Sequence, residues 1–159
     1  MNKARAQNQI RLRQIIQRKC CEEYQRQGYS VVPLRYGEKA LLGEDKGRTL
    51  AECRLNGDLS RLNGSLRNLG LLTGKAGADL VDIDLDCPEA LMLADRFLPR
   101  TGMVHGRRSA RRSHRWYICP GAKTERFQDS DGMLLEIRAD GRFTMVPPSL
   151  HPEGENVTW

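Results

Sequence analysis

The stretch LVDIDLDCPEA, residues 80–90, alternates aliphatic and acidic side chains, with carboxylates at Asp82, Asp84 and Asp86. Alternation with period two is typical of a half-buried β-strand, so the aliphatic side chains should enter the core and the carboxylates should share the other face. Neighbours on one strand face lie only about 7 Å apart, and ionised carboxylates at that distance repel each other unless a cation lies among them. The pattern leaves two interpretations open, a solvated acidic face or a divalent-metal site. Asp86 also suits the N-cap of a helix that begins near Pro88.

Length and composition limit the classes of protein that remain. The 159 residues suit one domain or two small units that share a core. No apolar run approaches the length of a membrane span, so no membrane partner is expected. The first residues lack the apolar core of a secretory signal, which favours a cytoplasmic location. Five cysteines without a Cys-x-x-Cys pair indicate reduced thiols rather than a zinc site or a disulfide framework.

The charge of the chain favours a polyanionic partner. Lysine and arginine number 26 against 20 acidic residues, a formal net charge of +6. The densest basic segment is HGRRSARRSHR, residues 105–115, with arginines at Arg107, Arg108, Arg111, Arg112 and Arg115. Such a cluster is either a phosphate-facing surface that binds DNA or a solvated loop.

The expected helices have apolar residues near helical spacing. The first covers residues 4–27 and ends at Gly28, with an apolar face of Leu12, Ile15, Ile16, Cys20 and Tyr24. The second covers residues 87–99, with Pro88 at its first position and an apolar face of Leu91, Leu93, Ala94 and Phe97.

The expected strands surround the acidic one. Residues 29–34 form a strand in which Pro33 indicates a strand end or a sheet edge. Residues 69–74 form a buried strand that ends in a glycine turn, and residues 113–119 form another. Residues 132–149 are typical of a hairpin with its turn at Asp140-Gly141. We therefore expect an α+β or mixed α/β fold with a partly antiparallel sheet.

These segments, in this order, resemble a known family. The segments GYSVVPL, LGLLTGKAGADLVDIDLD, SHRWYI and LLEIRADGRFTMVPPSLHPEG together resemble the primase-polymerase (prim-pol) domain of the archaeo-eukaryotic primase superfamily. The resemblance is to members encoded by plasmids, phages and integrated elements. It implies an archaeo-eukaryotic primase-like catalytic core, with an RRM-like unit packed with helices, over residues 28–159, preceded by an amphipathic helix over residues 1–27.

The resemblance implies roles for individual residues. Asp82 and Asp84 match the family's paired acids and Glu136 matches its third acid, so these three would be catalytic and hold two Mg²⁺ or Mn²⁺ ions. His114 matches the histidine that contacts the incoming triphosphate, and Arg138 lies where a basic residue can serve the same phosphates. The candidate ligands are hard carboxylate oxygens, which Mg²⁺ and Mn²⁺ prefer, and the absence of cysteine from the motif argues against zinc.

Further matches lie in the turns of the family pattern. Lys39 and Thr73 match positions near the nucleotide, Gly74 matches the turn before the acidic strand, and Ser149 matches a Pro-Pro-Ser element. The expected substrates are an NTP or dNTP and a single-stranded or primed DNA template. Relatives usually continue beyond Pro-Pro-Ser and often carry a helicase, so a helicase domain or partner is expected.

Two departures from the family pattern bear on the site. The third acid is Glu136 where Asp is commoner, and Arg112 occupies the place of a small hydroxyl residue two positions before His114. From the residues alone, His114 is either a phosphate ligand or a packed core residue beside Trp116. Trp116 and Tyr117 could stack on bases, but on an alternating strand one of them faces the core.

The expected function is DNA-templated nucleotidyl transfer by a primase or polymerase in the replication of a mobile element. Two other classes remain open. One is a non-catalytic single-stranded DNA-binding module with a relic of the site, which the arginines before His114 favour. The other is a metal-dependent nuclease, which would use the same acids.

Overall fold

The computed structural model describes residues 3–159 and shows an α+β fold, as predicted, in which every pairing between its named strands is antiparallel. The helices are α1 (Lys3–Arg26), α2 (Leu50–Cys53) and α3 (Pro88–Phe97), with short 3-10 turns at Gly43–Asp45, Ser60–Leu62 and Lys75–Gly77. The strands are β1 (Val31–Arg35), β2 (Arg67–Leu72), β3 (Leu80–Leu85), β4 (Val104–Arg107), β5 (Ala110–Ile118), β6 (Glu125–Asp129), β7 (Gly132–Arg138) and β8 (Phe143–Val146).

The smaller sheet has three strands in the order β1-β2-β8. Strand β1 lies at an edge, which agrees with the sequence because Pro33 has no N–H to donate to a second neighbour. The middle strand β2 is almost wholly buried between its two partners. Leu69 and Leu71 pack with Tyr24 and Val146 in the main hydrophobic cluster.

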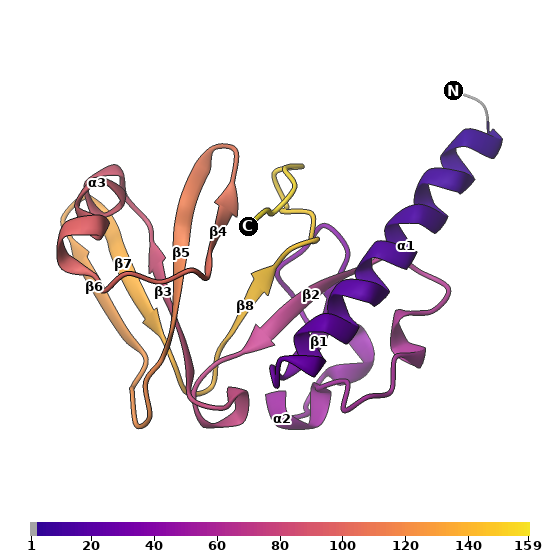
Figure 1. Cartoon of the computed structure of the whole chain (residues 1–159), viewed down its shortest axis with the longest axis horizontal. Coiled ribbons are helices and arrows are strands. Elements are labelled where there is room, and N and C mark those ends of the chain that lie inside the picture. The colour runs from indigo at the N-terminus through magenta and orange to yellow at the C-terminus, as the bar shows by residue number, and fades with distance from the viewer. Residues whose placement is uncertain (1–2) are drawn as a thin grey trace.

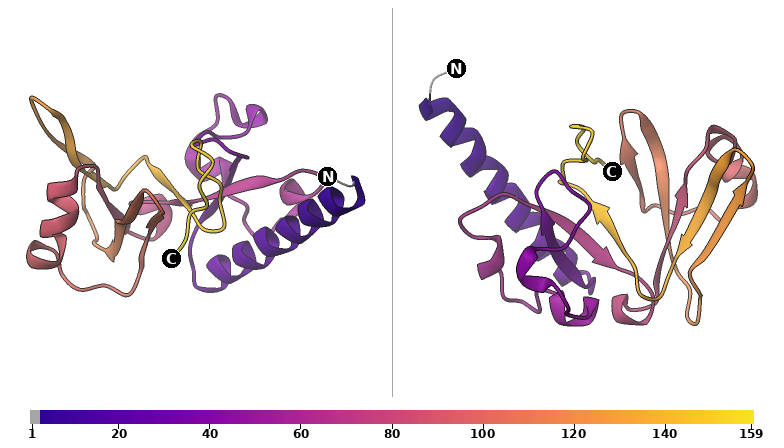
Figure 2. Two further views of the ribbon diagram at one scale, coloured as in Figure 1. Left: turned by 90° about the horizontal axis from the view of Figure 1, so that it is seen from above. Right: turned by 180° about the vertical axis from the view of Figure 1, so that it is seen from behind.

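The larger sheet has five strands in the order β4-β5-β3-β7-β6, with the acidic strand β3 at its centre. One face of β3 presents Val81, Ile83 and Leu85 to a hydrophobic cluster that contains Ala94 of α3. The other face presents the aspartates, as the alternation predicts. Figures 1 and 2 show the two sheets joined at one end and diverging from there.

The predicted hairpin over residues 132–149 is wrong, although both strands exist. Strand β7 pairs with β3 on one edge and with β6 on the other, so it has no free edge for β8. Strand β8 pairs with β2 in the smaller sheet instead. The Asp140-Gly141 segment is therefore the point at which the chain crosses between sheets. The strands β4 and β6 were not predicted.

Two crossings between the sheets lie side by side. The link from β2 to β3 contains Thr73, whose N–H donates to the carbonyl of Arg142 at 3.1 Å and whose hydroxyl donates to the carbonyl of Ala139 at 2.5 Å. The N–H of Lys75 donates to the Asp140 carboxylate at 2.6 Å. These bonds tie the β2–β3 link to the β7–β8 link, and so they fix one sheet relative to the other.

Helix α1 begins and ends close to the predicted limits, and Cys20 and Tyr24 of the predicted face pack against the core, but the rest of that face does not. Its buried residues are Gln17, Cys21 and Tyr24, spaced four and three positions apart. Leu12, Ile15 and Ile16, predicted to face the core, are 58%, 45% and 41% exposed. Figure 1 shows the reason: the first half of the helix extends past the sheets, so no core lies beside it.

Helix α3 also differs from expectation in detail. Ala94 is buried, but Leu93 and Phe97 are exposed because the short helix covers the sheet with a narrow strip only. Its N-cap is Cys87, whose sulfur accepts from the N–H of Ala90, and not Asp86. Among residues 3–159, no helix combines the length and the apolar character that crossing a membrane requires.

Candidate functional site

A continuous row of polar side chains crosses all five strands of the larger sheet. Directly opposite residues in antiparallel strands point to the same face, so register alone places these side chains together. Following the register from β4 to β6, the row consists of His105, His114, Asp84, Glu136 and Arg126. Residues from five separate segments therefore meet on the face that carries the aspartates.

A second, shorter row runs beside the first. Asp82 of β3 lies opposite Trp116 of β5 and opposite Arg138 of β7. The two rows bring Asp82, Asp84 and Glu136 onto one face, as the predicted shared site requires. Their common face is opposite to the one covered by α3.

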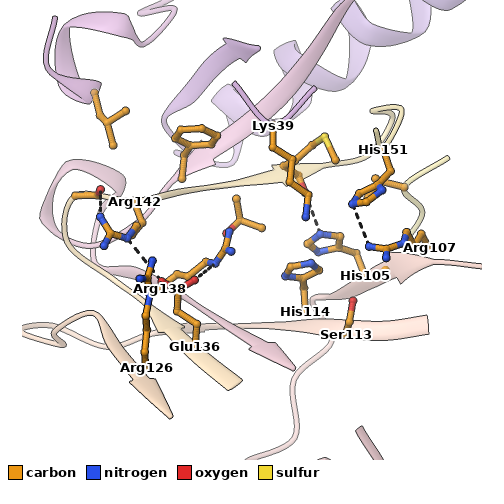
Figure 3. Close-up of a pocket in the computed structure, with 17 residues that line it drawn as sticks. Lys39, His105, Arg107, Ser113, His114, Arg126, Glu136, Arg138, Arg142 and His151 are labelled. Carbon is orange, nitrogen blue, oxygen red and sulfur yellow. Dashed lines mark hydrogen bonds and ion pairs between the residues drawn. The ribbon is translucent and has the colours of Figure 1, made fainter. Parts of the chain in front are cut away.

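A cavity of about 400 Å³ lies over this face and is closed on its other side by β8. Its lining includes His114, Glu136 and Arg138 from the larger sheet, and Thr144 and Met145 from β8. Lys39, Arg107 and His151 line the end near the C-terminal segment (Figure 3). Asp82 and Asp84 lie beneath this lining, 0% and 6% exposed.

Asp82 is a buried carboxylate with one bonded and one unbonded oxygen. Its Oδ2 accepts from His114 Nδ1 at 2.9 Å and from the hydroxyl of Thr144 at 2.7 Å. Its Oδ1 is buried without a hydrogen-bond partner among the described residues. Burial raises the pKa of Asp82, but the charge and hydrogen bond of His114 outweigh burial and lower the pKa below its ordinary value. The carboxylate is therefore ionised.

Arg138 lies between the other two carboxylates. Its Nη2 is 2.9 Å from Asp84 Oδ2, and its Nε donates to Glu136 Oε2 at 2.8 Å. The second oxygen of Glu136 accepts from Arg126 at 3.0 Å. Burial raises the pKa of Glu136, but the two arginines outweigh burial and lower the pKa below its ordinary value. Burial raises the pKa of Asp84, and His114 and Arg138 only partly offset it.

His114 connects the aspartates to the cavity. Its Nδ1 donates to Asp82 and lies 3.4 Å from Asp84 Oδ1. Burial lowers the pKa of His114, but the two carboxylates outweigh burial and raise the pKa above its ordinary value. Its Nε2 has no hydrogen-bond partner within residues 3–159, and the residue lines the cavity. A protonated His114 can therefore donate from Nε2 to an anion.

Further cations surround the same space. Lys39 lines the cavity without an ion pair among the described residues, and burial lowers its pKa. Arg107 donates to His151 Nε2 at 3.0 Å and pairs with Glu153. Arg142 lies 3.7 Å from Glu136. Basic groups that converge on a cavity above buried acids suit a polyphosphate.

The donor chemistry of the acids fits a divalent cation, but their present arrangement does not assemble a site. Mg²⁺ and Mn²⁺ prefer carboxylate oxygens, and the unbonded Oδ1 of Asp82 is such a donor. Among the described residues, however, no group of three His, Cys, Asp or Glu side chains is placed to hold a metal ion. Asp84 and Glu136 are instead bonded to Arg138, whose guanidinium takes the place of a cation between them.

The structure separates some residues that the sequence grouped with the site. Thr73 is buried at the crossing between the sheets, does not line the cavity, and bonds to backbone as described above. Arg115 points to the opposite face of the sheet, where its side chain is 5% exposed and pairs with Asp95 at 2.6 Å. Ser149 is buried and accepts from the N–H of Leu69.

The other arginines of residues 105–115 lie around a second hollow. Its volume is about 650 Å³, and it is bordered by Arg107, Arg108, Arg111 and Arg112 together with the C-terminal residues. Arg107 lines both this hollow and the central cavity. The cluster thus extends outward from the site along β4 and β5.

Sequence reasoning missed several side chains that the fold brings to the site. Thr144 and Arg126 bond to acids from strands whose pairing was not predicted, so neither carried a signal of its own. The sequence carries no signal for His105, because it matches no motif of the family pattern. Its stacking on His114 depends on the unpredicted strand β4.

An α+β fold with buried acids beneath a cavity lined by basic groups has the charge that phosphorylated ligands require. The comparison with protein families gives the particular class. The family model named Prim-Pol, bifunctional DNA primase/polymerase, N-terminal, matches residues 21–159, and the chain belongs to this family. No match was found among curated proteins or among solved structures.

Proposed function

We propose that this chain is a metal-dependent nucleotidyltransferase that extends nucleic-acid chains on a DNA template. Membership of the family implies DNA primase or polymerase activity, with DNA and nucleotides as substrates. The observation that supports catalysis by this chain is the face shared by Asp82, Asp84 and Glu136 beneath a cavity lined by His114 and Arg138. The resemblance to plasmid and phage members supports a role in replicating a mobile element.

The residues of the chain have distinct roles in this mechanism. His114 donates from Nε2 to a triphosphate oxygen, and Asp82 holds its ring by the bond to Nδ1. Lys39 and Arg138 add positive charge to the same phosphates. Asp82, Asp84 and Glu136 would hold two Mg²⁺ or Mn²⁺ ions once Arg138 has moved to the nucleotide. When bound, such ions activate the primer hydroxyl and neutralise the leaving pyrophosphate.

The DNA strand is expected to approach along the arginine-bordered hollow. Arg107, Arg108, Arg111 and Arg112 supply charge there for the phosphate backbone, and Arg107 joins this hollow to the cavity. Arg115 has no part in this surface, because it is buried against Asp95 on the other face.

The proposal is tested by primer extension with Asp82→Asn and Asp84→Asn. Each change removes a charge but little volume, so nucleotide incorporation should fall by about two orders of magnitude or more, as when a group that stabilises a charged transition state is lost. Incorporation is measured on a primed DNA template with each nucleotide set and each metal ion. The matched control is Asp131→Asn, because Asp131 is exposed in the turn before β7, away from the site.

The same preparations separate the alternative functions. Labelled single-stranded DNA incubated with Mn²⁺ and no nucleotide would be degraded by a nuclease and left intact by a polymerase. DNA binding without incorporation under any condition would identify a non-catalytic module. Normal extension by both aspartate variants would refute the assignment of the acids.

A further inference from the structure

His105 is a buried histidine at the site whose presence the proposed mechanism does not explain. It lies on β4 with 1% of its surface exposed, next to His114 in the cross-strand row. The two imidazole rings are stacked, with centroids 4.4 Å apart and planes inclined by 8°. Figure 3 shows both rings side by side at the cavity.

Both nitrogens of the His105 ring are bonded, which defines its tautomer. The indole N–H of Trp116 donates to Nδ1 at 2.9 Å, so Nδ1 carries no proton. The other nitrogen, Nε2, therefore carries the hydrogen and donates to the carbonyl of Met145 at 3.1 Å. Because Trp116 belongs to β5 and Met145 to β8, His105 bridges the two sheets directly behind His114.

The neutral state of His105 suits its place beside His114. Burial, with a smaller contribution from His114, lowers the pKa of His105 to about 3. A neutral ring can stack against the His114 ring without charge repulsion, whatever the protonation state of His114. The ring of His114 is then constrained by the stack on its face and, at Nδ1, by the bond to Asp82 and the carboxylate of Asp84 at 3.4 Å.

We infer that His105 is a positioning residue, which holds the His114 ring in the orientation that aims Nε2 into the cavity. Without the stack, the ring would be held by polar contacts at Nδ1 alone, to Asp82 and Asp84, and rotation about that atom would turn Nε2 away from the phosphates. This inference rests on the proposed function for the phosphate contact itself. The order of the His114 ring does not depend on that function.

Two substitutions separate positioning from packing. His105→Phe keeps an aromatic face against His114 but leaves the Trp116 N–H and the Met145 carbonyl without partners. His105→Gln keeps a donor and an acceptor for those groups but removes the aromatic face. A purely structural role predicts that Phe is the more harmful change, because buried polar groups without partners are costly. A positioning role predicts the opposite order for phosphate binding.

The measurements use the full chain with inorganic triphosphate as the probe. Calorimetric titration gives its affinity, denaturant unfolding gives stability, and ¹⁵N NMR of the histidine rings reports the Nδ1–H of His114. We expect His105→Phe to be the less stable variant and yet to retain triphosphate affinity. We expect His105→Gln to lose affinity by about tenfold or more, since small misplacements of an interacting group are expensive, and to lose the protected Nδ1–H signal.

Several outcomes would overturn the inference. The first is a triphosphate affinity that falls in the same order as stability, and the second is an affinity equal to that of wild type in both variants. The third is an unchanged His114 signal in His105→Gln. Leu62→Ala, a core change in the main hydrophobic cluster away from the site, controls for general loss of stability and should leave the His114 signal unaltered. If the wild-type chain binds no triphosphate while the NMR differences persist, the proposed function fails and the positioning role stands.

Discussion

At the scale of the residue, basic side chains of the same site balance the charge of its acids. Asp82, Asp84 and Glu136 are each bonded to a cation that the fold supplies, chiefly His114 and Arg138. The alternation of residues 80–85 predicted that the aspartates share a face, and the register confirms it. Their burial was not predictable from that segment, because the strands and the β8 segment that cover them come from elsewhere in the chain.

Arg138 provides the sharpest residue-scale prediction. Its guanidinium occupies the position of a cation between Asp84 and Glu136, so Arg138→Gln should free Asp84 Oδ2 and Glu136 Oε2. Unit charges about 4 Å apart attract each other by about 4 kcal/mol at an effective dielectric constant of 20. A tenfold change in affinity corresponds to only about 1.4 kcal/mol, so part of that attraction is enough to produce it. We therefore expect Arg138→Gln to bind Mn²⁺ at least about tenfold more tightly than wild type without nucleotide, measured by electron paramagnetic resonance.

The same variant should bind triphosphate more weakly, because it has lost a phosphate contact. Arg126→Gln is the matched control: Arg126 is bonded to Glu136 only and is more exposed, so its loss should change Mn²⁺ affinity less. Mn²⁺ affinity that is unchanged or lower in Arg138→Gln would show that Arg138 does not compete with the metal ion.

At the scale of the element, periodicity predicted the existence of helices and strands better than their partners. The limits of α1 and the strand at 80–85 agree with the sequence. Helical spacing identified an apolar face on α1, but the buried face passes through Gln17, whose side chain bonds to the backbone of Arg67. The hairpin at 132–149 failed for a related reason, since turn residues define where a strand ends and not which neighbour has a free edge.

Helix α1 allows this distinction to be measured. Leu12 and Ile16 are exposed, so Leu12→Gln combined with Ile16→Gln should change the free energy of unfolding by no more than about 0.5 kcal/mol. Tyr24→Phe should cost about 1 kcal/mol, because the buried hydroxyl donates to the Pro147 carbonyl at 2.6 Å. Urea unfolding monitored by circular dichroism compares the two. A loss above about 2 kcal/mol in the double variant would mean that this face is covered in solution.

At the scale of the whole molecule, the site depends on how the two sheets are joined. The acids belong to the larger sheet, whereas Thr144 and Met145, which bond to Asp82 and His105, belong to the smaller one. The family resemblance predicted the acids and His114 because each lies in a short motif. It could not predict Thr144, because its bond to Asp82 joins residues 62 positions apart and requires both crossings between the sheets.

Gly74 lies at this junction and gives the prediction at the largest scale. Its φ is +65°, and a Cβ there would lie 2.2 Å from the Asp140 carboxylate and 2.5 Å from the Asp140 backbone. Gly141 also has a positive φ, +70°, but a Cβ there would have no atom within 4 Å. Alanine substitutions at Gly74 and Gly141 therefore separate two losses of stability. Both include the backbone cost of a positive φ, but only Gly74→Ala also pushes the two crossings apart.

We expect Gly141→Ala to lose about 1 to 2 kcal/mol of unfolding free energy, the usual cost of a left-handed backbone for a residue with a Cβ. Gly74→Ala should lose about 1 to 3 kcal/mol more, because the added methyl group overlaps backbone that cannot move without separating the sheets. Urea unfolding of both variants gives the difference. In Gly74→Ala the shift should also reach the site, weakening the bond between Thr144 and Asp82, so the ring signals of His114 should change by NMR. Equal losses in the two variants, with unaltered His114 signals, would show that the close packing of the crossings does not hold the sheets together.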